Sequence, residues 1–136
     1  GFVDYLAEQA VVRRSEFSAQ GISNLAWAFA ALDIQNRELM SSLAAEAELM
    51  LGSFSPQGLS NMLWASAKLG FSSVAFIEAV SSLVVRKMND FKPQEISNCV
   101  WALATLLVHD SELLCTVSHH ALRQAEDCSA QELSNI

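Results

Sequence analysis

Apolar positions in this sequence recur at helical spacing, and the whole pattern returns with a fixed period. The chain contains FSAQGISNLAWAFAAL at 17–32, FSPQGLSNMLWASAKL at 54–69 and FKPQEISNCVWALATL at 91–106, and a further copy opens at 128–136. Successive copies begin 37 residues apart without slippage. Self-similarity at such a period is the sequence signature of a repeat architecture.

Each copy is predicted to form two helices joined by a short turn. The first helix is expected to open at Ser18, Ser55, Lys92 and Ser129, where the serine copies can act as N-caps. Pro56 and Pro93 fit its first position, where a missing N–H has no consequence. Apolar residues at helical spacing then predict a buried face on this helix and another on the helix that follows it.

Helix pairs of this length stack side by side, so the expected fold is all-α. We expect an α-solenoid of 37-residue helix-turn-helix repeats that winds as a right-handed superhelix. The whole chain, 1–136, is then one segment of a repeat array. Its predicted parts are the second helix of a truncated repeat at 1–16, repeat 1 at 17–53, repeat 2 at 54–90, repeat 3 at 91–127 and the start of repeat 4 at 128–136.

Amide side chains return in every copy on the first helix. Asparagine and glutamine have no particular helix propensity that explains so strict a recurrence. The amides either tie neighbouring repeats together by hydrogen bonds, or line an inner surface and contact one unit of an extended polymer per repeat. The candidate general contacts are Gln20, Asn24, Gln57, Asn61, Gln94 and Asn98, with Gln131 and Asn135 in the fourth copy.

Positions beside these amides differ between the copies. If the array reads a nucleotide sequence, selective contacts are expected at such variable positions, while the amides hold the common backbone. Neutral drift on a solvated face is the alternative explanation. The candidates for selective or basic contacts are Gly21, Ala31, Gly58, Lys68, Lys92, Glu95 and Thr105.

Each complete copy also carries one tryptophan, at Trp27, Trp64 or Trp101, among small alanines. Large aromatic side chains dominate core burial, so we expect these residues to pack between repeats. Stacking on a nucleobase is the alternative.

The net charge weighs against one class of function. With 8 Lys and Arg against 15 Asp and Glu, the chain carries a formal charge of −7, the wrong sign for a protein that chiefly binds a phosphate backbone.

The longest nearly apolar run of the sequence, 99–108, is about half of the ~20 residues that span a membrane. Neither a membrane span nor a signal peptide is expected. Three irregularly spaced cysteines favour a reducing compartment.

Catalysis finds little support in the sequence. Cys115 lies four residues before His119, but no third ligand accompanies them, and a zinc site needs three or four. No glycine-rich phosphate loop or other catalytic motif occurs. We therefore expect no enzymatic activity, no cofactor, no metal and no small-molecule substrate.

The unit at 54–69, with SN followed by WASAKL, resembles the octotricopeptide repeat, a family of degenerate helix pairs of about 38 residues. The resemblance covers essentially the whole chain. It implies an α-solenoid that binds organellar RNA in chloroplasts or mitochondria and acts in RNA stability, processing, translation or ribosome assembly.

Two functions are therefore predicted. The first is binding of single-stranded RNA or ribosomal RNA along the first-helix surface. The second is a protein scaffold within a large organellar complex, with partners that cover the ends of the solenoid. The acidic charge suits the scaffold better, and no membrane partner is expected for either.

Overall fold

The computed structural model describes residues 1–109 together with Cys115 and His119, and the regular structure of this part is entirely helical. The predicted all-α class is therefore confirmed. The predicted start of repeat 4 at 128–136, with Gln131 and Asn135, lies outside the described residues. The α-helices are α1 (Phe2–Val12), α2 (Ala19–Ala31), α3 (Arg37–Leu49), α4 (Pro56–Leu69), α5 (Val74–Arg86) and α6 (Pro93–His109), with short 3-10 helices η1 (Arg14–Glu16), η2 (Leu51–Ser53) and η3 (Met88–Asp90).

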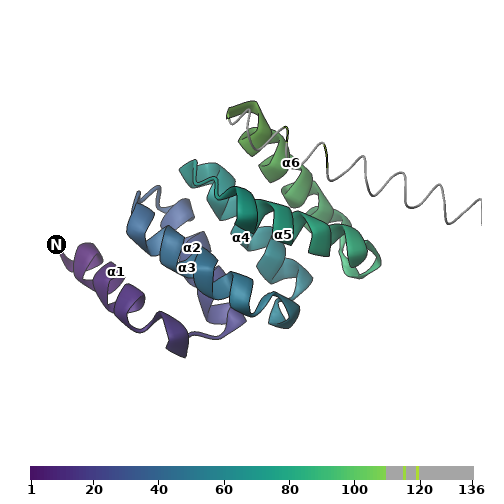
Figure 1. Ribbon diagram of the computed structural model, residues 1–136. Coiled ribbons are helices and arrows are strands. Elements are labelled where there is room, and N and C mark those ends of the chain that lie inside the picture. The colour runs from purple at the N-terminus through teal and green to yellow at the C-terminus, as the bar shows by residue number, and fades with distance from the viewer. Residues whose placement is uncertain (110–114, 116–118, 120–136) are drawn as a thin grey trace, which may run out of the picture.

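The helices form two layers (Figure 1). In one layer α2 packs on α4 and α4 packs on α6, and we call these three the first helices. In the other layer α1 packs on α3 and α3 packs on α5, and we call these the second helices. Within this part of the chain, no helix is both long and apolar enough to cross a membrane. The superhelical hand and the repeat boundaries stay predictions.

The first helices begin where the sequence predicts, but by two different capping devices. The hydroxyls of Ser18 and Ser55 each accept a hydrogen bond from the backbone N–H three residues on, at 3.1 and 3.0 Å. Pro56 occupies the first turn of α4. In the third copy the Glu95 carboxylate reaches back instead, and its Oε1 accepts a hydrogen bond from the backbone N–H of Lys92 at 2.8 Å. This is half of a capping box.

The residue at one repeat position determines where each first helix ends. Gly70 ends α4 in the left-handed conformation at φ 66°, and the equivalent Asp33 adopts φ 55° after α2. Glycine and, less readily, aspartate tolerate this conformation. The third copy has Leu107 at this position, and α6 continues through it to His109.

The core lies between the two layers and contains the apolar faces that the sequence predicts on α2 to α5. On the outer helices the prediction is wrong in part, because Val100 of α6 and Phe2 of α1 are 61% and 75% exposed. Several buried residues of the first helices are small, which suits their close packing on one another; they include Ala26, Ala30, Ala65, Ser66 and Ala102. The largest fully buried side chains include Ile22, Leu39, Leu43, Leu59, Leu63, Phe76, Ile77 and Val80.

Candidate functional site

One face of the first-helix layer carries the same order of side chains on every helix. Residues four, seven and eleven places after the first glutamine fall on one stripe at 100° per residue, opposite the core. We call this surface the amide-tryptophan face. It comprises Gln20, Asn24, Trp27 and Ala31 on α2, Gln57, Asn61, Trp64 and Lys68 on α4, and Gln94, Asn98, Trp101 and Thr105 on α6.

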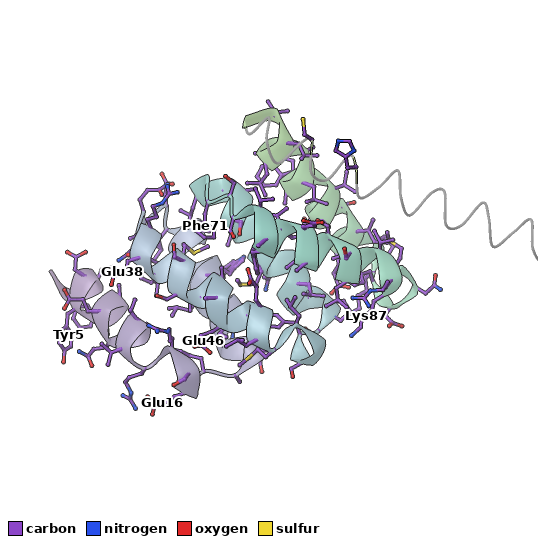
Figure 2. All side chains as sticks on the ribbon, in the orientation of Figure 1. Tyr5, Glu16, Glu38, Glu46, Phe71 and Lys87 are labelled. Carbon is purple, nitrogen blue, oxygen red and sulfur yellow. The ribbon has the colours of Figure 1, made fainter. Side chains whose placement is uncertain are left out.

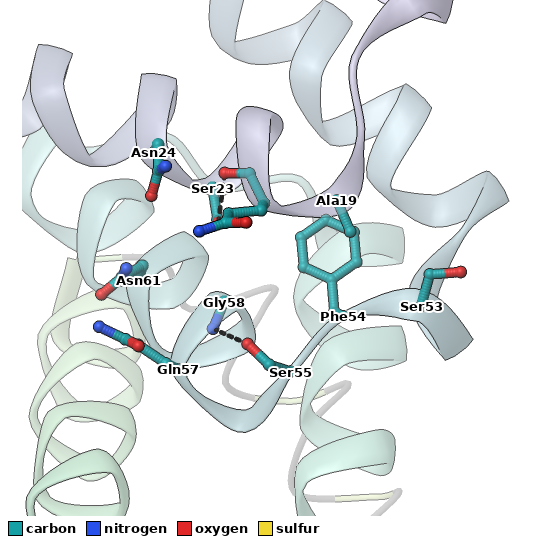
Figure 3. A pocket seen from close by; sticks show the side chains of 10 residues that line it. Ala19, Ser23, Asn24, Ser53, Phe54, Ser55, Gln57, Gly58 and Asn61 are labelled. Carbon is teal, nitrogen blue, oxygen red and sulfur yellow. Dashed lines mark hydrogen bonds between the residues drawn. The ribbon is translucent and has the colours of Figure 1, made fainter.

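Two pockets open on this face, one in each groove between neighbouring first helices. The first pocket, between α2 and α4, has a volume of about 400 Å³ and is lined by amides from both helices (Figure 3). The second pocket, between α4 and α6, has a volume of about 350 Å³. Most of its lining residues are those of the first pocket moved on by one repeat. Shared positions are Gln20, Ser23, Asn24, Ser55, Gln57, Gly58 and Asn61 in the first pocket, and Gln57, Ser60, Asn61, Lys92, Gln94, Glu95 and Asn98 in the second.

The amide side chains are exposed or half-buried, and within the described residues the structure records no hydrogen bond between them and another protein group. In Figure 3, Asn24 of α2 lies near Asn61 of α4, with Gln57 beside it. One neighbouring serine links two repeats instead, because the hydroxyl of Ser60 donates to the backbone carbonyl of Glu95 at 3.4 Å. The equivalent Ser23 donates to the Gln20 carbonyl of its own helix. The geometry therefore does not support the explanation that the amides tie the repeats together. Their role as ligand contacts stays a prediction.

Trp27 and Trp101 lie on this surface outside the core, whereas Trp64 is half-buried and packs against the core. Trp27 and Trp101 each keep nearly half of their surface exposed, at 48% and 47%. Contact between repeats is confirmed for one pair, because the rings of Trp27 and Trp64 stack with centroids 6.3 Å apart. For Trp101 packing between repeats stays a prediction. The helical period gives the reason for the place of the tryptophans on this surface. Each tryptophan lies seven residues after a glutamine, and seven residues at 100° each come to within about 20° of two full turns, so both side chains lie on the same face.

Charge is divided unevenly between the two layers. The second helices α1, α3 and α5 carry six acidic and two basic residues, whereas the first helices carry one of each, Glu95 and Lys68. Glu38 and Glu46 mark the acidic side in Figure 2. The Lys68 ammonium lies 5.8 Å from the centroid of the Trp64 ring, a cation–π distance. The amide-tryptophan face is therefore close to neutral although the chain is acidic.

The variable positions have different surroundings. A Cβ on the buried Gly58 would lie 3.2 Å from the Phe54 ring and 3.5 Å from the Ser23 hydroxyl, and Gly21 is similarly close to Phe17. These two glycines thus serve close packing at the start of a helix. The others are accessible in part: Ala31, Lys68 and Lys92 are exposed, and Glu95 and Thr105 are half-buried. Selective contacts at these positions stay predictions.

The remaining candidate chemistry is sparse. Burial raises the pKa of the Cys99 thiol, an effect that the hydrogen bond with Ser60 opposes and the nearby Glu95 charge reinforces. Cys115 and His119 are both exposed. Among residues that the structure describes, no three or more histidine, cysteine or acidic side chains gather as metal ligands would.

A comparison with protein families decides the relationship. The model of the RNA-editing substrate-binding complex 6 protein family matches residues 1–111. The chain belongs to this family. No curated protein matches the chain. The match to the RNA-editing substrate-binding complex 6 protein family covers α1 to α6 and both pockets.

The octotricopeptide assignment is therefore wrong. The period misled because any helix pair of this length needs apolar faces at helical spacing and small residues where neighbouring helices touch. Such positions made up much of the quoted motif. They reflect the packing that helix pairs of this length have in common and do not indicate membership of one family. The chloroplast and ribosome-assembly roles implied by that resemblance lose their support with it.

Proposed function

We propose that this chain is a component of an RNA-editing substrate-binding complex and binds single-stranded RNA on its amide-tryptophan face. The observation that carries the proposal is the exposure of amides and tryptophans at equivalent positions of three neighbouring helices. Amide side chains hydrogen-bond to base edges, and aromatic rings stack on bases. The family's name, which refers to the binding of RNA-editing substrates, supports the same function.

The spacing of the helices favours single strands over duplexes. Packed helices lie about 8–10 Å apart, whereas stacked bases rise only about 3.4 Å per residue of strand. Bases held in successive grooves must therefore be unstacked from one another, which a duplex does not permit. Protein recognition of RNA sequence likewise falls mostly on unpaired bases.

Among the described residues two cations serve this face, because Lys68 lies on it and Lys92 lines the second pocket. Arg13 is engaged elsewhere: its hydrogen bond and charge lower the pKa of Glu16. Arg14 lies 3.6 Å from Glu46 on α3. Binding on this face therefore depends on stacking and amide hydrogen bonds more than on phosphate neutralisation.

The first prediction concerns the salt dependence of binding. Fluorescence anisotropy with labelled single-stranded RNA of mixed sequence should show saturable binding and a logarithmic salt slope of about −1.4, because two cations release about 0.7 counterions each. Affinity then falls only about sevenfold between about 50 and 200 mM salt. The same RNA annealed to its complement should bind much more weakly. Absence of binding at the lower salt, or equal affinity for the duplex, contradicts the proposal.

A second function, docking of a protein helix, is favoured by one specific observation at the α1–α2 end of the stack. Leu32 is 70% exposed, whereas its equivalents Leu69 and Leu106 are 7% and 3% exposed. The groove between α1 and α2 also holds a pocket of about 500 Å³ lined mainly by apolar surface, including Leu6, Phe17 and Leu25. We propose that this edge receives an apolar helix with small contact residues, as α4 receives α2.

The test is a binding measurement with a labelled peptide of the α2 sequence, residues 18–32. It should bind the wild-type chain, and the variant Leu25→Glu should bind it at least about tenfold more weakly, because a charge would be buried under the docked helix. The variant Val85→Glu, at an exposed site on α5, should leave binding unchanged. Equal binding to both variants counts against docking at this edge.

We further propose that the chain acts in mitochondria, where RNA-editing complex proteins act, and that its role is binding rather than catalysis. The sparse chemistry of the described residues supports a binding role.

A further inference from the structure

We propose that the second pocket selects guanine over uracil and that Glu95 is the residue that discriminates between them. The inference rests on the proposed binding of single-stranded RNA. It arises from the comparison of the two pockets, which share seven positions in register and carry different residues at two of them, Ser55 or Lys92 and Gly58 or Glu95. At the position of Glu95 in the second pocket, the first pocket has Gly58, which carries no side chain.

The surroundings of Glu95 hold its carboxylate in place. Its Oε1 accepts a hydrogen bond from the Lys92 backbone N–H at 2.8 Å, and its backbone carbonyl accepts one from Ser60 at 3.4 Å. The side chain is half-buried and lines the pocket with Gln94 and Asn98 of its own helix. An ionised carboxylate has about four acceptor sites, so the bond to Lys92 leaves both oxygens able to accept more.

The chemistry of the pocket distinguishes the bases. The amides that line both pockets each offer donors and acceptors, so they bind any base edge. The Glu95 carboxylate offers acceptors alone. Guanine presents two adjacent donors on its Watson–Crick edge, the N1–H and the N2 amino group, which match the two carboxylate oxygens. Uracil presents one N–H between two carbonyl oxygens, and these repel the carboxylate.

The first pocket lacks this selectivity, because Gly58 contributes only backbone to it. Cytosine and adenine each present one amino group to a carboxylate, so we expect them to rank between guanine and uracil in the second pocket. A bound strand should therefore show one position of strong guanine preference, with an adjacent position that tolerates every base.

The test uses fluorescence anisotropy with oligouridine and with oligouridines that carry a single guanosine at each internal position in turn. Wild-type protein should bind at least one guanosine-containing strand about fivefold or more tightly than oligouridine, in keeping with the discrimination of a good bidentate contact. The variant Glu95→Gln should lose this preference while still binding RNA. Its amide oxygen can keep the bond from Lys92, so the cap is retained.

The matched control is Glu48→Gln, which removes the same charge from an exposed position on α3 in the other layer. This variant should keep the guanosine preference. Persistence of the preference in Glu95→Gln, its loss in Glu48→Gln, or its absence from the wild-type protein overturns the assignment of Glu95. Absence of binding to every oligonucleotide instead overturns the proposed RNA-binding function itself, so the two failures are distinguishable.

Discussion

Replacing Trp27 and Trp101 together by alanine is expected to weaken single-stranded RNA binding tenfold or more. Both rings are nearly half exposed on the amide-tryptophan face. Stacking of a base on an aromatic side chain contributes about 1–3 kcal/mol per base. The large effect follows from the small number of cations, since little phosphate attraction remains to hold the strand. The affinities of the single variants and the double variant, measured by anisotropy at constant salt, test this expectation.

The matched control is Tyr5→Ala on α1, where an exposed aromatic side chain lies in the other layer. This variant should bind RNA as the wild-type protein does. Circular dichroism should show that all variants keep their helical content. Wild-type affinity in the double tryptophan variant would exclude stacking on these rings as a source of binding.

Replacing Phe76 by alanine is expected to lower the free energy of unfolding by about 3–5 kcal/mol. Its side chain has no exposed surface and lies on α5, which packs on both α3 and α4. Removal of the ring leaves a cavity between the two layers that the surrounding helices fill only in part. Urea unfolding followed by circular dichroism measures the change as a shift of the midpoint.

Val85→Ala serves as the control on the same helix, because Val85 is half exposed. It should change the unfolding free energy by no more than about 0.5 kcal/mol. A Phe76→Ala variant of near wild-type stability would mean that the two layers do not share the core described above.

The uneven distribution of charge changes how the acidic composition is understood. A formal charge of −7 disfavours RNA binding only if the charge lies where the RNA binds. In the described helices the acidic excess lies on the second helices, including Glu8, Glu38 and Glu48, while the first helices are neutral in sum. The composition alone cannot show this division, because it depends on which helices share a layer.

By itself, the sequence determined the all-α class, the helix starts at Ser18, Ser55 and Lys92, and the buried faces of α2 to α5. These features depend on local capping and on the 3.6-residue period of the helix, and both can be found in the amino-acid sequence of one helix. The sequence also indicated which face of the first helix carries the tryptophans, because the same period places them on one stripe with the glutamines. The expectation that large aromatic residues are buried obscured that signal at Trp27 and Trp101.

Only the tertiary structure decided which surfaces stay open. The pocket between α4 and α6, the stacking of Trp27 on Trp64 and the exposed edge at Leu32 all depend on the neighbour that each helix has. Equivalent residues such as Leu32 and Leu69 share a repeat position and differ in burial, at 70% and 7% exposed. Burial in a repeat stack is a property of the contact between copies, and the sequence of one copy does not contain it.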